Sequence, residues 1–348
     1  MRRWFLWVLA SCAVALPLSL ADDGGVAAPP APAVPAAPPA PMLDAVKALA
    51  AKCVYEPAAF EMTVGPPIRF GEKVIVEMLT FRSPVTSVDP EKNDIVKAKL
   101  FRTDKPEPAL VVMFGGWRFD PATPKLAARL AEETNLQTLF VDLPFQGLRT
   151  PKDRKPGELT FSADLAQNEA TFVQAAQDVG RVLDWLVRER KVDPKRLGVL
   201  GTSLGGYVAC DLYGMTDRFS CCVGLITGGD VASVIFNGNR LTSKIRADLL
   251  AAGLEESGVR ERMRPLDPST WARKERKDGL LLIAAEEDEI VRLDTVRALA
   301  EAYGGAHLVV MEKSGHINPQ ALDDHFGEAV RHFSDRLLPK PATVPATK

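Results

Sequence analysis

The chain has 348 residues, of which 46% are hydrophobic and 25% are charged, and its formal net charge is −2. This composition is that of an ordinary globular protein, and the length suits one large domain or two small ones. The small net charge and the lack of a Lys/Arg-rich run argue against a polyanion-binding surface, so nucleic acid is not an expected partner.

Residues 1–21 have the pattern of a secretory signal peptide. Two arginines precede an apolar run that ends in small residues at Ser19 and Ala21. We therefore expect cleavage after Ala21, export to the periplasm, cell envelope or exterior, and no stable membrane span in the mature form. A lipoprotein box ending at Cys12 fits less well, because apolar residues continue beyond it. A retained anchor is the other alternative, because the run is near the lower limit of a membrane span.

The segment after the signal peptide is rich in proline and alanine, a composition that cannot form a packed core. We expect residues 22–41 to be an extended linker, residues 42–338 to be one folded domain, and residues 339–348 to be a disordered tail.

Four cysteines follow the signal peptide, and their spacing predicts neither a disulfide scaffold nor a metal site. Three of them, Cys210, Cys221 and Cys222, lie in apolar runs and are expected to be buried thiols. A disulfide that involves Cys53 is left open.

Apolar runs alternate with amphipathic stretches along the domain. Strands are predicted at residues 73–79, 95–101, 109–114, 137–143, 196–200, 219–227, 279–285 and 307–311. Helices are predicted at residues 124–134, 168–190, 203–214, 293–304 and 318–338. The first two strands form an antiparallel section, and the later alternation predicts βαβ units and a mostly parallel sheet. The alternation breaks at residues 228–277, which we expect to be a cap insertion.

The sequence Gly-Thr-Ser-Leu-Gly at residues 201–205 fits the pattern G-x-S-x-G, where a predicted strand ends and a predicted helix begins. In that context Ser203 occupies a strained turn with its hydroxyl at the end of the sheet, and side chains in place of the glycines would collide with neighbouring backbone. The backbone N–H of Leu204 points into the same space and can stabilise an oxyanion. The alternative is a glycine-rich turn with a capping serine.

A serine nucleophile needs a general base, and the chain has four histidines. His316 lies in a loop between the last predicted strand and the last predicted helix, where reacting groups gather at the edge of a parallel sheet. His307 begins a strand, and His325 and His332 lie on one face of the last helix, so we expect packing or surface roles for them. His316 is the candidate base.

The base needs a carboxylate that orients it. Residues 286–289 are all acidic and follow a predicted strand. We favour Asp288 for its position in the turn and because it gives the chain order Ser…Asp…His. The rival is Asp230, after the preceding strand.

The second oxyanion donor is expected in the loop that follows the strand at 109–114. Glycines at positions 115 and 116 let the backbone approach a substrate closely. The N–H of Gly116 or of Trp117 is the candidate, and the alternative is a simple tight turn.

Together these segments resemble the α/β-hydrolase superfamily. The resemblance rests on GTSLGG with Ser203, AAEEDEIV with Asp288, SGHINP with His316, and VVMFGGW. The sequence VDLPFQGLRTP at 141–151 resembles a loop of dienelactone-hydrolase-like and acetyl-xylan-esterase-like members. The resemblance implies a mostly parallel central sheet flanked by helices, with a small cap between the sixth and seventh core strands. The chain departs from the family pattern at two positions. Phe114 stands where the family usually has a histidine before the oxyanion glycine, and Ala285 stands where it usually has a glycine before the turn that carries the acid.

The function expected from these residues is hydrolysis of an ester-type bond, carboxylic ester or thioester, through an acyl-enzyme on Ser203. The expected partner is a small-molecule acyl substrate, and no metal or organic cofactor is needed. Ile235, Phe236, Leu241 and Trp271 of the cap could line an apolar acyl pocket, but capping the core is the role that we favour for most of them. The alternatives are a prolyl-oligopeptidase-type serine peptidase, which the lack of a run of periodic strands argues against, and a non-catalytic envelope binding protein.

Overall fold

The structure is a computed structural model that describes residues 40–118, 120–238 and 241–339. The predicted signal peptide, residues 22–39 of the predicted linker and residues 340–348 of the predicted tail lie outside the described residues. In the part that is described, no helix has both the length and the apolar character that a membrane crossing requires.

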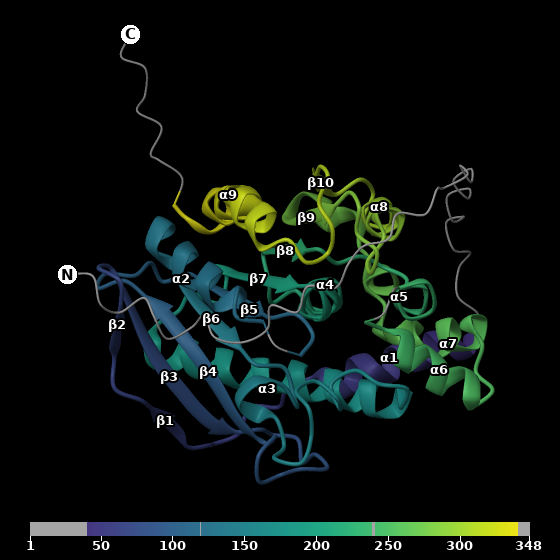
Figure 1. Ribbon diagram of the computed structural model, residues 1–348. Helices are drawn as coiled ribbons and strands as arrows, with labels where there is room; N and C mark the ends of the chain where they lie inside the picture. Colours follow the sequence, from purple (N-terminus) through teal and green to yellow (C-terminus); the bar gives the residue numbers. More distant parts are fainter. Residues whose placement is uncertain (1–39, 119, 239–240, 340–348) are drawn as a thin grey trace, which may run out of the picture. The chain divides into compact units, whose positions relative to one another are not determined.

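Ten described strands form one sheet, in the order β1-β3-β4-β6-β5-β7-β8-β9-β10, with β2 also paired to β3 (Figure 1). The pairs β1–β3, β2–β3, β3–β4 and β4–β6 are antiparallel, whereas β6, β5, β7, β8, β9 and β10 run parallel to one another. The mostly parallel sheet that the sequence predicts is therefore confirmed. The strand bounds are β1 (Met62–Val64), β2 (Ile68–Phe70), β3 (Val74–Arg82), β4 (Ile95–Arg102), β5 (Leu110–Phe114), β6 (Gln137–Val141), β7 (Leu197–Thr202), β8 (Cys221–Leu225), β9 (Leu280–Ala285) and β10 (His307–Met311).

The central parallel strands are continuous apolar runs because both of their faces are covered. Every residue of β5, β6, β7, β8 and β9 is buried, as expected where helices pack on both sides of a parallel sheet. Strand β3, by contrast, alternates between buried and partly exposed residues along most of its length. That alternation is typical of a strand with one face in the core.

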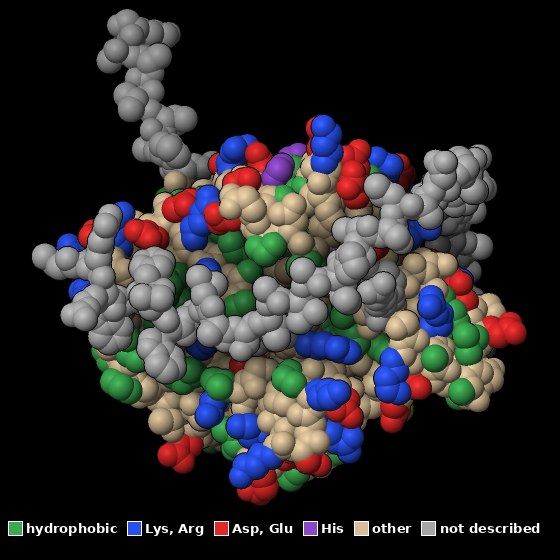
Figure 2. All heavy atoms as spheres, in the orientation of Figure 1, with side chains coloured by type: hydrophobic (Ala, Val, Ile, Leu, Met, Phe, Trp, Pro, Cys, Tyr) green, Lys and Arg blue, Asp and Glu red, His purple; other side chains and the backbone are tan. Residues whose placement is uncertain are grey.

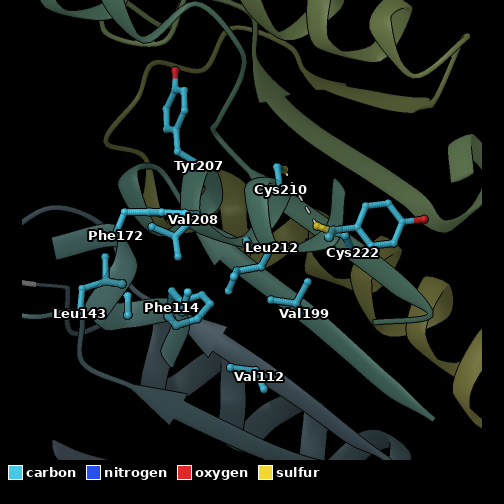
Figure 3. Packing of buried hydrophobic residues seen from close by; sticks show 14 of the residues in the cluster. Val112, Phe114, Leu143, Phe172, Val199, Tyr207, Val208, Cys210, Leu212 and Cys222 are labelled. Carbon is cyan, nitrogen blue, oxygen red and sulfur yellow. Dashed lines mark hydrogen bonds between the residues drawn. The ribbon is translucent and has the colours of Figure 1, made fainter. Parts of the chain in front are cut away.

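Helices form two layers, one on each face of the sheet. On one face Leu110, Val112 and Phe114 of β5 pack in a cluster with residues of α3, α4 and α8, part of which Figure 3 shows. On the other face Val111 and Met113 pack with residues of α2 and α9. The helix bounds are α1 (Ala40–Cys53), α2 (Thr123–Thr134), α3 (Leu165–Arg190), α4 (Leu204–Met215), α8 (Leu293–Ala302) and α9 (Pro319–Leu337).

The segment between β8 and β9, which is expected to be a cap insertion, folds into short helices. They are α5 (Val231–Asn237), α6 (Ser243–Ala251) and α7 (Glu256–Met263), followed by the 3₁₀ turns η2 (Arg264–Leu266), η3 (Pro268–Trp271) and η4 (Lys274–Gly279). Ile235, Leu249 and Val259 are fully buried in the same cluster as α3 and α4. The cap is therefore continuous with the core on the α4 side of the sheet.

A buried ion pair anchors the loop that follows β6. Arg149, in the 3₁₀ turn η1 (Gly147–Arg149), has its Nη1 2.9 Å from Oδ2 of Asp178 on α3, and both side chains are fully buried. Arg149 Nε also donates to the carbonyl of Asn93 at 2.8 Å. These contacts fix the loop against α3 on the side where the site lies. The four described cysteines are free thiols, three of them buried.

Candidate active site

Ser203 occupies the junction between β7 and α4. Its φ of 51° and ψ of −117° are rare for a residue with a side chain, and such strain persists only where the surroundings enforce it. The Ser203 N–H donates to the carbonyl of Leu225 on β8 at 2.8 Å, which ties the junction to the neighbouring strand. The strained turn that the G-x-S-x-G pattern predicts is present.

The two glycines of the pattern are required by close backbone contacts. A Cβ on Gly201 would lie 2.0 Å from the carbonyl oxygen of Gly205, and a Cβ on Gly205 would lie 2.4 Å from that of Gly115. The second contact also brings the loop after β5 against the junction. A Cβ on Gly116 would lie 3.7 Å from Cβ of Ser203, so this loop and the serine hydroxyl border the same space.

The structure brings Ser203, His316 and Asp288 into contact from three loops. Ser203 Oγ lies 2.9 Å from His316 Nε2, and His316 Nδ1 lies 2.7 Å from Asp288 Oδ2. The side chains of His316 and Asp288 are 8% and 1% exposed. Oδ1 of Asp288 accepts the N–H groups of Ile290 and Val291, each at 2.8 Å. This arrangement can move a proton from hydroxyl to imidazole while a fixed carboxylate stabilises the imidazolium.

The other candidates for base and acid have different partners. Asp230 caps α5 by accepting the N–H of Ser233 at 3.1 Å, and it pairs with Arg260 at 3.0 Å. His325 Nδ1 lies 2.8 Å from the carbonyl of Ala321. His332 Nε2 lies 3.0 Å from the carbonyl of Gly279, and burial lowers the pKa of His332 to about 4. His307 is exposed at the start of β10.

One of the predicted oxyanion donors has another acceptor. The Gly116 N–H donates to Oδ2 of Asp120 at 2.8 Å, which corrects the expectation that this group is free. Neither the N–H of Leu204 nor that of Trp117 donates to an acceptor in the described part of the chain. The Trp117 side chain is fixed by a 2.8 Å bond from Nε1 to the carbonyl of Gly157. Leu204 and Trp117 are therefore the pair that suits an oxyanion.

Asp120, which none of the sequence motifs indicated, links the loop after β5 to the serine junction. Its Oδ2 accepts the Thr123 hydroxyl at 2.6 Å, and Thr123 Oγ1 lies 3.1 Å from Thr202 Oγ1. Its Oδ1 accepts the N–H groups of Ala122 and Thr123. The Asp-Pro pair just before a predicted helix indicates an Asx turn and could have identified this residue.

A cavity of about 80 Å³ adjoins Ser203. Its wall comes from α3, α4, the cap and the loops after β5, β6 and β9, and it is mainly apolar. Of the four cap residues considered for an acyl pocket, Leu241 lines the cavity. Ile235 and Phe236 instead pack in the main core, and Trp271 donates its Nε1 proton to the carbonyl of Pro265. Among the described residues no cluster of His, Cys, Asp and Glu has the arrangement of a metal site.

A comparison with protein families finds one match. The profile described as "Prolyl oligopeptidase family" matches residues 165–338, half of the chain, which contain Ser203, Asp288 and His316. No curated protein matches the sequence.

Solved structures with the same fold have low sequence identity. An acetyl xylan esterase from Paenibacillus sp. R4 superposes with a TM-score of 0.63 at 18% identity, over 84% of this chain and 93% of its own. Acetyl xylan esterase 1 from Thermoanaerobacterium sp. JW/SL YS485 has a TM-score of 0.62 at 16% identity, over 86% and 95%. A Pyrococcus horikoshii acylaminoacyl peptidase has a TM-score of 0.56 at 14% identity, over 78% of this chain and 43% of its own. Because the family match covers half of the sequence and these structures share the architecture, the chain belongs to the prolyl oligopeptidase family and has the α/β-hydrolase fold.

Proposed function

We propose that the protein is a serine hydrolase that cleaves ester-type bonds of small acyl substrates through an acyl-enzyme. The observation that carries this proposal is the continuous contact from the Ser203 hydroxyl through His316 to the buried carboxylate of Asp288. A hydroxyl, an imidazole and a carboxylate in this order are what nucleophilic catalysis by serine requires.

The proposed mechanism has two half-reactions. Ser203 Oγ attacks the carbonyl carbon while its proton passes to His316 Nε2, and the N–H groups of Leu204 and Trp117 bind the oxyanion. The intermediate expels the alcohol, which takes the proton from His316. Water then attacks the acyl-enzyme, again giving a proton to His316, and this proton returns to Ser203 as the acid leaves. The carboxylate of Asp288 orients His316 and stabilises the imidazolium.

Ester bonds are favoured over peptide bonds by the solved structures that match nearly whole. The acetyl xylan esterases are covered over 93% and 95% of their own length. The matched peptidases are much longer, and this chain covers 49% of a puromycin hydrolase and 43% of the acylaminoacyl peptidase. Peptide hydrolysis is the second candidate function, because the matching family is named for an oligopeptidase.

The first test replaces the nucleophile. We expect the wild-type protein to react covalently with a fluorophosphonate probe and to hydrolyse p-nitrophenyl acetate. Ser203→Ala should abolish the labelling and lower kcat/KM at least about 1,000-fold, because oxyanion binding alone retains little of the rate.

The substrate class is tested with a panel of p-nitrophenyl esters and aminoacyl-naphthylamides. Faster turnover of the esters supports the proposal, whereas turnover of the amides alone makes the protein a peptidase. Folded protein that neither takes the probe nor turns over either series is a non-catalytic binding protein.

A further inference from the structure

The polar side chains that line the cavity beside Ser203 differ in whether they have a hydrogen-bond partner within the protein. Most of them are already hydrogen-bonded within the protein. The hydroxyls of Thr160, Thr171 and Thr242 donate to backbone carbonyls, the Asn168 amide bonds the backbone of Ser162, and Trp117 Nε1 donates to Gly157. These groups shape the wall but have little capacity left for a ligand.

Tyr207 and Asp211 are the exceptions. They are 7% and 1% exposed, and among the described residues neither the Tyr207 hydroxyl nor Oδ1 of Asp211 has a hydrogen-bond partner. Both line the cavity. Buried polar groups without partners are rare in folded proteins, and each calls for an explanation. A ligand that enters the cavity would supply the missing partner.

The two side chains continue a row that begins at the nucleophile. Ser203, Tyr207 and Asp211 are spaced by four residues, which places them on one face of α4. Figure 3 shows Tyr207 projecting from α4 on the side away from Phe114 and Val112 of the sheet. Asp211 comes eight positions after Ser203, a rise of about 12 Å along the helix. Asp211 therefore lies at the remote end of a row that starts at the reacting atom.

The lining of the cavity places acceptors, and no described cation, where a positively charged group would enter. No Lys, Arg or His is among the described residues that line the cavity. Burial raises the pKa of Asp211 well above its usual range, and the carboxyl of Asp267 nearby raises it further. Burial and Asp267 act on the pKa of Tyr207 in the same direction. A positive charge in the cavity would meet acceptors on this side and no described cation.

We propose that the cavity binds a substrate with an unbranched apolar portion that ends in a primary ammonium group, held by Asp211 and Tyr207. As the ammonium enters, Asp211 releases its proton to solvent, and the ammonium then donates to the resulting carboxylate and to the hydroxyl oxygen of Tyr207. The apolar walls hold the carbon chain. The volume of about 80 Å³ suits a narrow chain. This inference rests on the proposed function, because it assigns the reacting carbonyl to Ser203 and the amine to the far end of the same substrate.

Binding is tested first, without turnover. Wild-type protein is titrated by calorimetry with n-hexylamine and n-octylamine, and with the alcohols and alkanes of the same lengths. We expect at least one amine to bind about 10-fold or more tightly than its alcohol. Asp211→Asn, which keeps the size of the side chain and removes the carboxylate, should abolish this preference. Asp335→Asn removes a carboxylate from the exposed end of α9 and should retain it.

Two results of the calorimetric titrations would contradict the ammonium site. Alcohols that bind as tightly as the amines in the wild type, or an amine preference that survives Asp211→Asn, would overturn the proposal. If Asp211→Asn does not fold, Tyr207→Phe provides the second variant, with an expected loss of a few-fold in amine affinity and unchanged affinity for alkanes. Amine affinity unaffected by Tyr207→Phe would then count against it.

Kinetics separate this inference from the proposed function. The p-nitrophenyl esters of ω-amino acids are compared with the esters of unsubstituted acids of equal length, and kcat/KM should be higher for the amino series at the matching length. Ester hydrolysis with no amino preference at any length refutes the ammonium site and leaves the hydrolase intact. Amine binding in a protein that hydrolyses no ester and takes no probe keeps the ammonium site and refutes the hydrolase.

Discussion

At the scale of single residues, the site depends on a few side chains that hold backbone in position. Ser203 is kept in a strained conformation that costs on the order of 1–3 kcal/mol, and the glycines at 201 and 205 make room for it. Asp120 holds the loop that carries Trp117, since it accepts the Gly116 N–H and the Thr123 hydroxyl. We regard Asp120 as a positioning residue that acts through the loop.

Replacement of Asp120 should therefore change the rate more than the affinity. In Asp120→Asn one carboxylate oxygen becomes an amide NH2 group, which cannot accept a hydrogen bond. The loop therefore loses an anchor, and the Trp117 N–H shifts. We expect kcat on p-nitrophenyl acetate to fall by about 10-fold to 100-fold with little change in KM, since small displacements at a reacting centre are costly.

The neighbouring threonine provides the matched control. Thr123→Ser keeps the hydroxyl that bonds Asp120 and should keep most of kcat, whereas Thr123→Val removes it and should act like Asp120→Asn. A rise in KM at constant kcat in both loop variants would show that Asp120 serves binding rather than positioning.

The buried carboxyl of Asp211 makes the stability of the protein depend on pH. Burial raises the pKa of Asp211 well above its usual value of 3.8. At pH values between 3.8 and the pKa in the folded state, the folded protein therefore retains a proton that the unfolded chain releases. The stabilising contribution is complete below about pH 4 and is lost as pH rises, by about 1.4 kcal/mol per pH unit.

Asp211→Asn removes this proton linkage. The difference in free energy of unfolding, variant minus wild type, should increase from about pH 4 to pH 7 in urea titrations followed by circular dichroism. Asp335→Asn should show a nearly constant difference over the same range. A constant difference for Asp211→Asn as well would mean that its carboxyl is not protonated in the folded protein.

At the scale of elements, the sequence predicted most of the sheet but not the polar contacts between its layers. Every predicted strand and helix has a counterpart, because long apolar runs and amphipathic periods report burial directly. Helix α1 and the short strands β1 and β2 were not predicted. The residues of β1 and β2 are at most partly buried, and three residues carry too little periodicity. The pairing of Arg149 with Asp178 depends on tertiary proximity, which the local pattern does not contain.

That ion pair should be among the most sensitive points between elements. Both side chains are fully buried, and although burial raises the pKa of Asp178, the Arg149 guanidinium opposes this effect. Asp178→Asn leaves a buried cation without its partner, so we expect a loss of about 3–5 kcal/mol in the free energy of unfolding.

An exposed pair serves as the comparison for this loss. Lys244 Nζ lies 2.7 Å from Asp248 Oδ2 on the surface of α6, and Asp248→Asn should cost less than about 1 kcal/mol in urea unfolding. Equal effects of the two substitutions would show that the buried pair contributes no more than a surface contact.

At the scale of the whole molecule, the site is where distant segments converge, and this decides how much of it the sequence could predict. Ser203, Asp288 and His316 were identified because each follows a recognisable strand and their chain order fits one fold. The choice of Trp117 over Gly116, and the roles of Asp120 and Asp211, depend on how helices, cap and loops meet. On the face that Figure 2 shows, acidic and basic side chains are interspersed.

The position of β10 at the margin of the sheet has a consequence for inactivation. Among the described strands β10 pairs only with β9, most of its residues are at least partly exposed, and the loop with His316 follows it directly. Edge strands of a sheet unfold locally at a lower free-energy cost than central strands. The imidazole of His316 should therefore separate from Ser203 before the core unfolds. Esterase activity should disappear at a lower urea concentration than the far-ultraviolet circular dichroism signal, and coincident midpoints would contradict this order. The proposed base, His316, is thus carried by the part of the sheet that is expected to unfold first.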